Sequence, residues 1–199
     1  MATVTLNPSG DTQLISTSPT TNFNTSTFLG IGESDGVTEV RRSLIRFDLS
    51  SIPAGSVINS ATLRLYCVQD LSTVARALRV YRSLRAWIED QATWNVYATG
   101  NNWQTAGGFG ALDCEQTAIG SRSFTASEAI NVYKEWTLTP SAIQEMVNGT
   151  FANNGFLIRA DTETNDAYRF NSNAAASNKP ELVIVYTVSG RQFQAVIIG

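Results

Sequence analysis

Alternating apolar and polar residues form the clearest pattern along this chain. The segments 43–49 and 61–68 both repeat with a period of two residues, which indicates β-strands with one buried face. A short connection containing Pro53 and Gly55 separates them, so we expect antiparallel neighbours, with a crossover between two sheets as the alternative. The apolar face of this pair predicts core positions at Ile45, Phe47, Leu63 and Leu65.

Shorter runs of the same kind recur through the rest of the sequence. The segments that predict further strands are 2–8, 27–32, 77–87, 133–138, 155–161, 167–173 and 180–188. Because they follow one another closely and do not alternate with helices, they indicate an all-β domain. The expected architecture is a jelly-roll β-sandwich of about eight to ten antiparallel strands with one short helix. We expect this domain to span residues 1–188.

One helix is predicted at 139–149, where the sequence reads TPSAIQEMVNG. Thr139 is expected to cap it, Pro140 suits its first position, and Gly149 suits its C-terminal stop. Its apolar face has the helical spacing, with Ile143, Met146 and Val147. A helix this short is expected to close one end or edge of the sheet core.

Two segments stand outside the strand pattern. Residues 88–117 form a long connection with two tryptophans and several glycines, and long ordered loops tend to be functional or well packed. Residues 189–199 form a C-terminal extension with a second apolar run. We expect this run to add as a strand either to its own domain or to the sheet of a neighbouring subunit. Its candidate assembly residues are Phe193, Val196, Ile197 and Ile198.

Composition and charge exclude several classes of protein. The net charge of −3 and the pI of about 5.0 argue against a general nucleic-acid surface. Without histidine, the chain has no Ser-His-Asp or Cys-His relay and no histidine-ligated zinc or iron. Cys67 and Cys114 are far apart, so two free thiols are favoured over a disulfide, with Cys67 buried on a strand. The N-terminus has no signal-peptide features, and no apolar run reaches membrane-spanning length.

Several short motifs occur together in an order typical of a known family. They are GDTQL, PTTNFN, RSLIRFDLSSIPAGSVINSATLRLY, LRAWIEDQATWN, WQTAGGFGALD, LTPSAIQEMVNGT, NNGFLIRAD, YRFNSN and KPELVIVY. In this order the chain resembles the DNRLRE-type domain, also classed as the family 96 carbohydrate-binding module, over about residues 3–187. The resemblance implies a jelly-roll β-sandwich that binds polysaccharide without catalysis, in some members with a structural calcium ion. The motif that gives the family its name is not spelled out in this chain.

Arginines within the expected strands are the first candidates for a binding site. If several fall on one sheet face, they make a basic strip on an otherwise acidic protein. Their planar guanidinium groups pair bidentately with carboxylates, so such a strip suits an alginate-like uronate polymer, as the resemblance also implies. The alternative is a solvated face of arginine–carboxylate pairs. The candidates are Arg46, Arg64, Arg79, Arg159 and Arg169.

Aromatic side chains offer a second route to a sugar, because sugar rings stack on indole faces. Trp103, flanked by polar residues and glycines, is the tryptophan expected to be most exposed, with pinning of the loop as the alternative role. Trp87 and Trp94 are instead expected to pack structurally.

A structural calcium ion is the cofactor expected if the chain has one at all, because only hard oxygen ligands are present. The candidate ligands lie in expected loops or at strand ends, where Asx turns and caps are the alternative role. They are Asp11, Asn22, Asp113, Asp161 and Asp166.

Catalysis is not expected. Glycoside hydrolysis needs two carboxylates that face each other across a cleft, and nothing in the spacing of Glu89, Asp90, Asp113 and Glu115 requires that role.

We therefore expect a non-catalytic, surface-displayed structural or adhesion protein. The leading interpretation is a phage virion decoration, head-fibre or tail-associated protein, which assembles with its own copies or other virion proteins and binds host glycans. The alternative is a uronate-binding module of a larger secreted or cell-surface protein. Neither nucleic acid nor a membrane is an expected partner.

Overall fold

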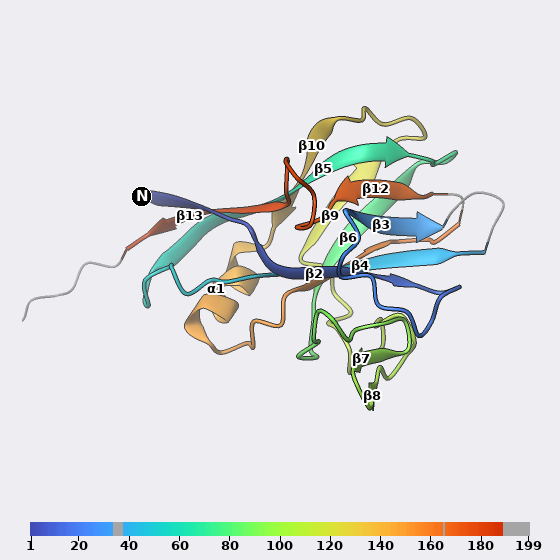
Figure 1. Cartoon of the computed structure of the whole chain (residues 1–199). Coiled ribbons are helices and arrows are strands. Elements are labelled where there is room, and N and C mark those ends of the chain that lie inside the picture. Colours follow the sequence, from blue (N-terminus) through green and yellow to red (C-terminus); the bar gives the residue numbers. More distant parts are fainter. Residues whose placement is uncertain (34–37, 165, 189–199) are drawn as a thin grey trace, which may run out of the picture.

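The computed structural model describes residues 1–33, 38–164 and 166–188, which form thirteen strands and one helix. The strands are β1 (Ala2–Leu6), β2 (Pro8–Ile15), β3 (Phe28–Glu33), β4 (Val40–Phe47), β5 (Val57–Asp70), β6 (Arg76–Arg82), β7 (Val96–Ala98), β8 (Asn101–Asn102), β9 (Gly120–Phe124), β10 (Val132–Leu138), β11 (Phe156–Ala160), β12 (Tyr168–Asn171) and β13 (Glu181–Thr187). The helix α1 spans Pro140–Asn148. The all-β class with one short helix is therefore confirmed (Figure 1).

Eleven of the strands pair in one continuous sheet that closes on itself. The ring runs β5-β10-β9-β6-β11-β4-β3-β12 and returns to β5 through the pairing of β12 with β5. Every ladder in it is antiparallel. Outside the ring, β13 and β1 continue from β5, and β2 pairs with β4 (Figure 1).

The closed ring differs from the two separate sheets that the sequence predicted. Two narrow seams join its halves: β9 meets β10 through one residue pair, Leu138 and Gly120, and β3 meets β4 through two pairs. Because hydrogen bonds continue across both seams, the strands form a barrel-like sheet and not two independent layers. The antiparallel pairing expected from the alternating pattern is nevertheless confirmed.

Every second side chain along the strands points inward, and these side chains fill the interior of the barrel-like sheet. On the long strand β5, Leu63, Leu65 and Cys67 are fully buried, and their neighbours in the sequence are half-buried. Ile45 and Phe47 of β4 are also buried, so all four predicted core positions are confirmed. Three large aromatic side chains, Phe124, Trp136 and Phe170, pack against one another at the centre.

The helix lies against this core as predicted. Its buried residues are Ala142, Ile143 and Met146. Gly149 takes a left-handed conformation with φ 73° and ends the helix through backbone bonds to Glu145 and Met146. Thr139 occupies the N-cap, but its hydroxyl donates to the backbone oxygen of Ile119 and makes no capping bond.

The long connection expected to be functional or well packed forms a covering layer on the outer face of β4, β11 and β6. We call residues 84–119 the covering layer; it includes β7 and β8 (Figure 1). A second apolar cluster lies between this layer and the sheet, formed by Leu14, Leu44, Tyr81, Trp87, Ala92, Trp103, Cys114 and Leu157. Part of the outer face of the barrel is therefore buried, at Leu44, Tyr81 and Leu157.

Both cysteines are free and buried, Cys67 on β5 and Cys114 in the covering layer, so the prediction of two unpaired thiols is confirmed. Burial raises the pKa of the Cys67 thiol to about 11 and that of the Cys114 thiol to about 12.

No helix in the described part of the chain has the length and apolar character needed to span a membrane. The predicted C-terminal extension, with Phe193, Val196, Ile197 and Ile198, lies outside the described residues.

Candidate binding pocket

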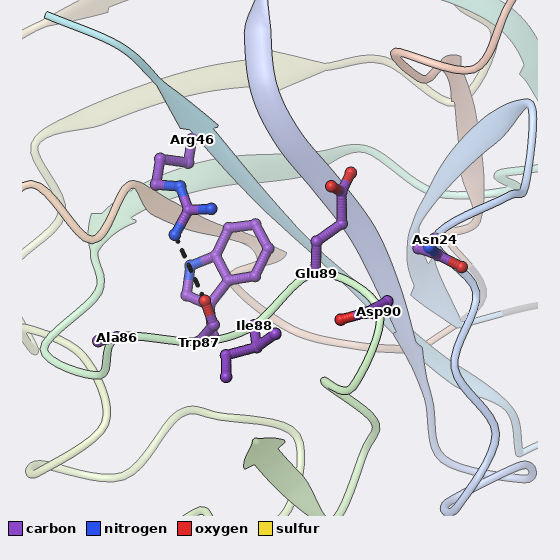
Figure 2. A pocket seen from close by; sticks show the side chains of 7 residues that line it. All are labelled: Asn24, Arg46, Ala86, Trp87, Ile88, Glu89 and Asp90. Carbon is purple, nitrogen blue, oxygen red and sulfur yellow. Dashed lines mark hydrogen bonds between the residues drawn. The ribbon is translucent and has the colours of Figure 1, made fainter. Parts of the chain in front are cut away.

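An open pocket of about 700 Å³ lies where the covering layer meets β4. Its lining residues are Asn24, Arg46, Ala86, Trp87, Ile88, Glu89 and Asp90. Figure 2 shows the guanidinium of Arg46 beside the indole of Trp87, with the side chains of Glu89, Asp90 and Asn24 on the other side. We call this feature the Arg46 pocket.

Arg46 projects from the outer face of β4, because Ile45 and Phe47 on either side of it point into the core. Its guanidinium lies 4.9 Å from the centroid of the Trp87 ring, and Nη1 donates a 3.4 Å hydrogen bond to the Trp87 carbonyl. It forms no ion pair with any described residue, unlike most arginines of the chain. Its charge is therefore oriented by the indole but not neutralised by a bound carboxylate.

Trp87 forms the floor of the pocket and is itself almost completely buried. Its Nε1 donates a 2.7 Å hydrogen bond to the backbone oxygen of Asn154, which precedes β11. This bond joins the covering layer to the barrel and fixes the ring under Arg46. The packing role predicted for Trp87 is confirmed, and its face is occupied by the guanidinium.

Glu89 is held in place from two sides. Its Oε1 accepts a 2.9 Å hydrogen bond from the backbone N–H of Asp11 on β2, and its backbone oxygen accepts one from Nδ2 of Asn22 at 2.7 Å. Asn22 also donates to the Ala92 carbonyl at 2.7 Å. The acidic turn at the pocket is thus pre-positioned by β2 and by the β2–β3 connection, which limits the ordering that a ligand would have to impose.

Asp11 lies buried behind this turn. Its Oδ2 accepts a 2.7 Å hydrogen bond from the backbone N–H of Asn173. Burial, with a smaller contribution from the charge of Glu89, raises the pKa of Asp11 to about 7, against the lowering effects of the Asn173 bond and of Lys179. The ionised carboxylate is therefore disfavoured in the folded protein.

This raised pKa predicts a specific pH dependence. Because the folded pKa of Asp11 exceeds its ordinary value of 3.8, the stability it contributes is fully present below about pH 4 and is lost as the pH rises through about 7. Asp11→Asn keeps an acceptor for the Asn173 N–H and removes the ionisation. We expect the variant to equal the wild type near pH 4 and to be more stable at pH 8, by about 1–3 kcal/mol.

Urea unfolding at pH 4, 5, 6, 7 and 8 measures this difference. Asp166, whose pKa burial raises to about 6, remains in both proteins and so cancels from the comparison. A stability difference between Asp11→Asn and wild type that does not change with pH would contradict the assignment.

The other predicted arginines do not join Arg46 in one strip. Arg64 lies on the outer face of β5 between Glu135 and Glu181, with its guanidinium 4.4 Å from the Tyr133 ring. Arg169 on β12 bonds to Gln69 at 2.9 Å and lies over the Phe28 ring.

Arg79 and Arg159 do lie side by side, opposite each other on β6 and β11. Arg79 pairs with Asp161 at 3.6 Å, and Arg159 pairs with Glu163 at 3.1 Å beneath Phe109 of the covering layer. The alternative interpretation, a face of arginine–carboxylate pairs, therefore describes Arg64, Arg79 and Arg159.

Trp103 is buried, with 5% of its surface exposed, so the expectation that it is the most exposed tryptophan is wrong. Its Nε1 donates to the Thr93 carbonyl at 2.9 Å, and its ring packs against Tyr97. It fixes the covering layer internally, which is the loop-pinning role named as its alternative.

The predicted calcium ligands do not come together. Asp11 and Asn22 both lie near Glu89, whereas Asp161 bonds to the backbone N–H groups of Ala77 and Thr162. Asp166 is buried beside Arg76, and Asp113 is buried within the covering layer. Within the described ranges, no cluster of three or more acidic or cysteine side chains has the arrangement of a metal site. Several of these carboxylates accept backbone N–H groups from distant parts of the chain, such as that of Asn173 for Asp11 and that of Glu33 for Asp166.

Trp87, which the sequence assigned to packing, and Glu89, which it did not assign to a binding site, both line the pocket. Asn24 was not singled out, although it is the last residue of the PTTNFN motif. The available signal was the WIED sequence, which places an aromatic residue and two carboxylates within four positions.

The fold and the pocket together define a class: an all-β, barrel-like domain whose covering layer forms an open polar pocket at one edge. The sequence model of the disaggregatase related repeat domain matches residues 11–184, and the chain belongs to that family. The match begins at Asp11 in β2 and ends at Ile184 in β13, so it includes the whole barrel and the pocket. None of the curated proteins matches the chain.

Proposed function

We propose that this protein is a non-catalytic, surface-displayed adhesion protein that binds a carboxylate-bearing polysaccharide in the Arg46 pocket. One observation carries the proposal: Arg46 is fixed over Trp87 at an open pocket and has no carboxylate partner among the described residues. A guanidinium in this state presents paired N–H donors that match the geometry of a uronate carboxylate.

The remaining lining suits the rest of a sugar unit. Glu89 and Asp90 offer acceptors for hydroxyl groups, and Asn24 offers both a donor and acceptors. Ile88, with 42% of its surface exposed, adds an apolar contact for a C–H face. The two carboxylates also disfavour dense polyanions, so the proposal favours a polymer with separated carboxylates over a sulfated or phosphorylated one.

The acidic side chains near the pocket support a binding role without catalysis. Glu89 accepts the N–H of Asp11, Asp113 accepts three backbone N–H groups, and Glu115 pairs with Arg82. These three carboxylates thus already have structural partners. A glycosidase pair instead needs two carboxylates free to face one substrate bond.

The finer family assignment is part of the same proposal. We propose that the chain is related to the DNRLRE-type domain and family 96 carbohydrate-binding module, whose jelly-roll sandwich the barrel approaches through its two narrow seams. The family description as a repeat domain supports the interpretation as a module of a larger secreted or cell-surface protein.

Arg46→Ala tests the pocket directly. We expect the variant to bind uronate oligosaccharides about ten- to a hundredfold more weakly, because a charge-assisted, bidentate contact is worth about 1.5–3 kcal/mol. Isothermal titration calorimetry with alginate-type oligomers measures the change. The matched control is Arg79→Ala, which removes an arginine already paired with Asp161 and should leave affinity unchanged.

A glycan array that includes neutral and sulfated polymers establishes the ligand class. Equal loss of binding in the two arginine variants, or no uronate binding by the wild type, would overturn the proposal.

A second candidate context is a virion decoration, head-fibre or tail-associated protein. The observation that favours it is the edge strand β1, which pairs on one side with β13 and, within the described residues, with no other strand. An open edge of this kind supports assembly with other copies. Electron microscopy of the native particle or cell surface distinguishes this context from a secreted module.

A further inference from the structure

Strand β1 forms the outer edge of the sheet that extends beyond the barrel. Its five residues pair in unbroken antiparallel register with β13, from Ala2 opposite Tyr186 to Leu6 opposite Leu182. Val4 and Leu6 pack against the main core, and Thr3 and Thr5 point outward to solvent. The second edge of β1 therefore presents backbone N–H and C=O groups that no described strand pairs.

This edge lacks the features by which proteins usually block strand addition. Residues 2–6 include no charged residue and no proline, and the β1–β13 ladder shows no bulge. The edge formed by β2 is different: it contains Pro8, its ladder shifts register between Pro8 and Gly10, and Glu89 accepts the Asp11 N–H. One edge of the sheet is thus protected and the other is open.

A complementary strand sequence follows β13. Residues 192–198 read QFQAVII, a run without charge or proline in which Phe193, Ala195 and Ile197 alternate with other side chains. In an extended strand, Phe193, Ala195 and Ile197 lie on one face and Gln194, Val196 and Ile198 on the other. An apolar run of this kind is unfavourable in water unless a sheet edge or core covers it.

The direction in which residues 192–198 would run relative to β1 decides which copy of the chain supplies this strand. β13 runs antiparallel to β1 and ends next to Ala2, so the chain's own extension could reach the open edge only by crossing over the start of β1 and running parallel to it. All ladders among the described residues are antiparallel, and parallel pairs are slightly less stable per residue. The extension of a second copy can approach antiparallel.

We propose that residues 192–198 of one copy add as an antiparallel strand to the open edge of β1 in a second copy. Reciprocal exchange closes a two-fold dimer, because each copy has one donor strand and one acceptor edge. Residues Phe193, Ala195 and Ile197 then cover the flank of Val4 and Leu6. The proposal concerns the β1 edge alone and does not depend on the Arg46 pocket.

Light scattering on size-exclusion fractions tests the assembly. We expect the full chain to have twice the mass of one 21.6 kDa chain, and a chain ending at Val188 to have the mass of one. Far-UV circular dichroism checks that the shortened chain keeps its strands. Ile197→Lys in the full chain should also give a monomer, whereas Gln194→Lys, on the opposite face, should not.

Cross-linking establishes which copy donates the strand. One chain carries Thr5→Cys and a differently tagged chain carries Gln194→Cys; the native cysteines are buried and do not compete. A short bis-maleimide should join the two tagged chains, and Ser127→Cys in place of Thr5→Cys should not be joined. A monomeric full chain or a dimer that survives truncation would overturn the proposal. So would a cross-link that forms within one chain carrying both Thr5→Cys and Gln194→Cys but not between the two tagged chains.

Discussion

Gly155→Ala is expected to destabilise the fold by about 2–5 kcal/mol, and Gly100→Ala by about 1–2 kcal/mol. Both glycines have φ 76°, so any alanine there carries the same backbone strain. They differ in their surroundings: a Cβ on Gly155 would lie 2.3 Å from the backbone oxygen of Ile45, and one on Gly100 would meet nothing within 4 Å. The difference between the variants isolates the steric contact.

Denaturant unfolding of both variants measures this difference. Because the added Cβ would also approach Arg46 to 2.8 Å, Gly155→Ala should also weaken, in the folded fraction, the uronate binding proposed for the Arg46 pocket. Equal unfolding free energies for the two variants would show that β4 and the turn before β11 can separate without cost, which contradicts the described packing.

Asp113→Ala is expected to lower stability by about 3–5 kcal/mol and to release the covering layer. Its buried carboxylate accepts the backbone N–H groups of Gln104, Thr105 and Gly110 at 2.8, 2.9 and 3.2 Å. Arg85 lies 3.3 Å from the same group. Removing the carboxylate leaves these donors without an acceptor in a site that water does not reach.

Urea unfolding gives the free energy, and limited proteolysis within residues 84–119 reports the covering layer separately. The control is Asp48→Ala: Asp48 is exposed and accepts one N–H, that of Ser50, so its removal should change stability little. A covering layer that stays protease-resistant without Asp113 would show that its apolar cluster is sufficient.

The strand pattern was readable because burial alternates wherever a strand has one face in the core, as on β5. It failed at β2, where all but Pro8 lies outside the segments predicted as strands. There Asp11, Thr12 and Gln13 are all buried, so polar residues occupy positions where the pattern expects apolar ones. Asp11 accepts a hydrogen bond from Asn173, far along the chain, and Gln13 bonds to Ser26 and Gly30, and no local signal in the sequence marks these partners.

The candidate site was predictable only in part for a related reason. Alternation correctly assigned Arg46, Arg64, Arg79 and Arg159 to outward positions, but it does not say which outward faces coincide. Closure of the sheet distributes them around the barrel, and the covering layer then buries the face beneath Phe109. The tertiary arrangement of the sheet and the covering layer decides which arginine lies at an open pocket. The alternation of apolar and polar residues carries no information about that arrangement.

The pairing of β1 with β13 also determines how the protein responds to tension. Ala2 lies opposite Tyr186, so a force that pulls these two ends apart loads one hydrogen-bonded pair of the ladder at a time. Strands loaded in this way unzip at low force, whereas strands pulled along their length must break all their bonds together. β1 lies outside the eight-strand ring and is only partly buried, so it can separate from β13 while the ring stays paired. β13 remains fixed by Leu182 and Ile184 in the core, and the β1–β13 ladder would act as an extensible link that yields before the barrel does.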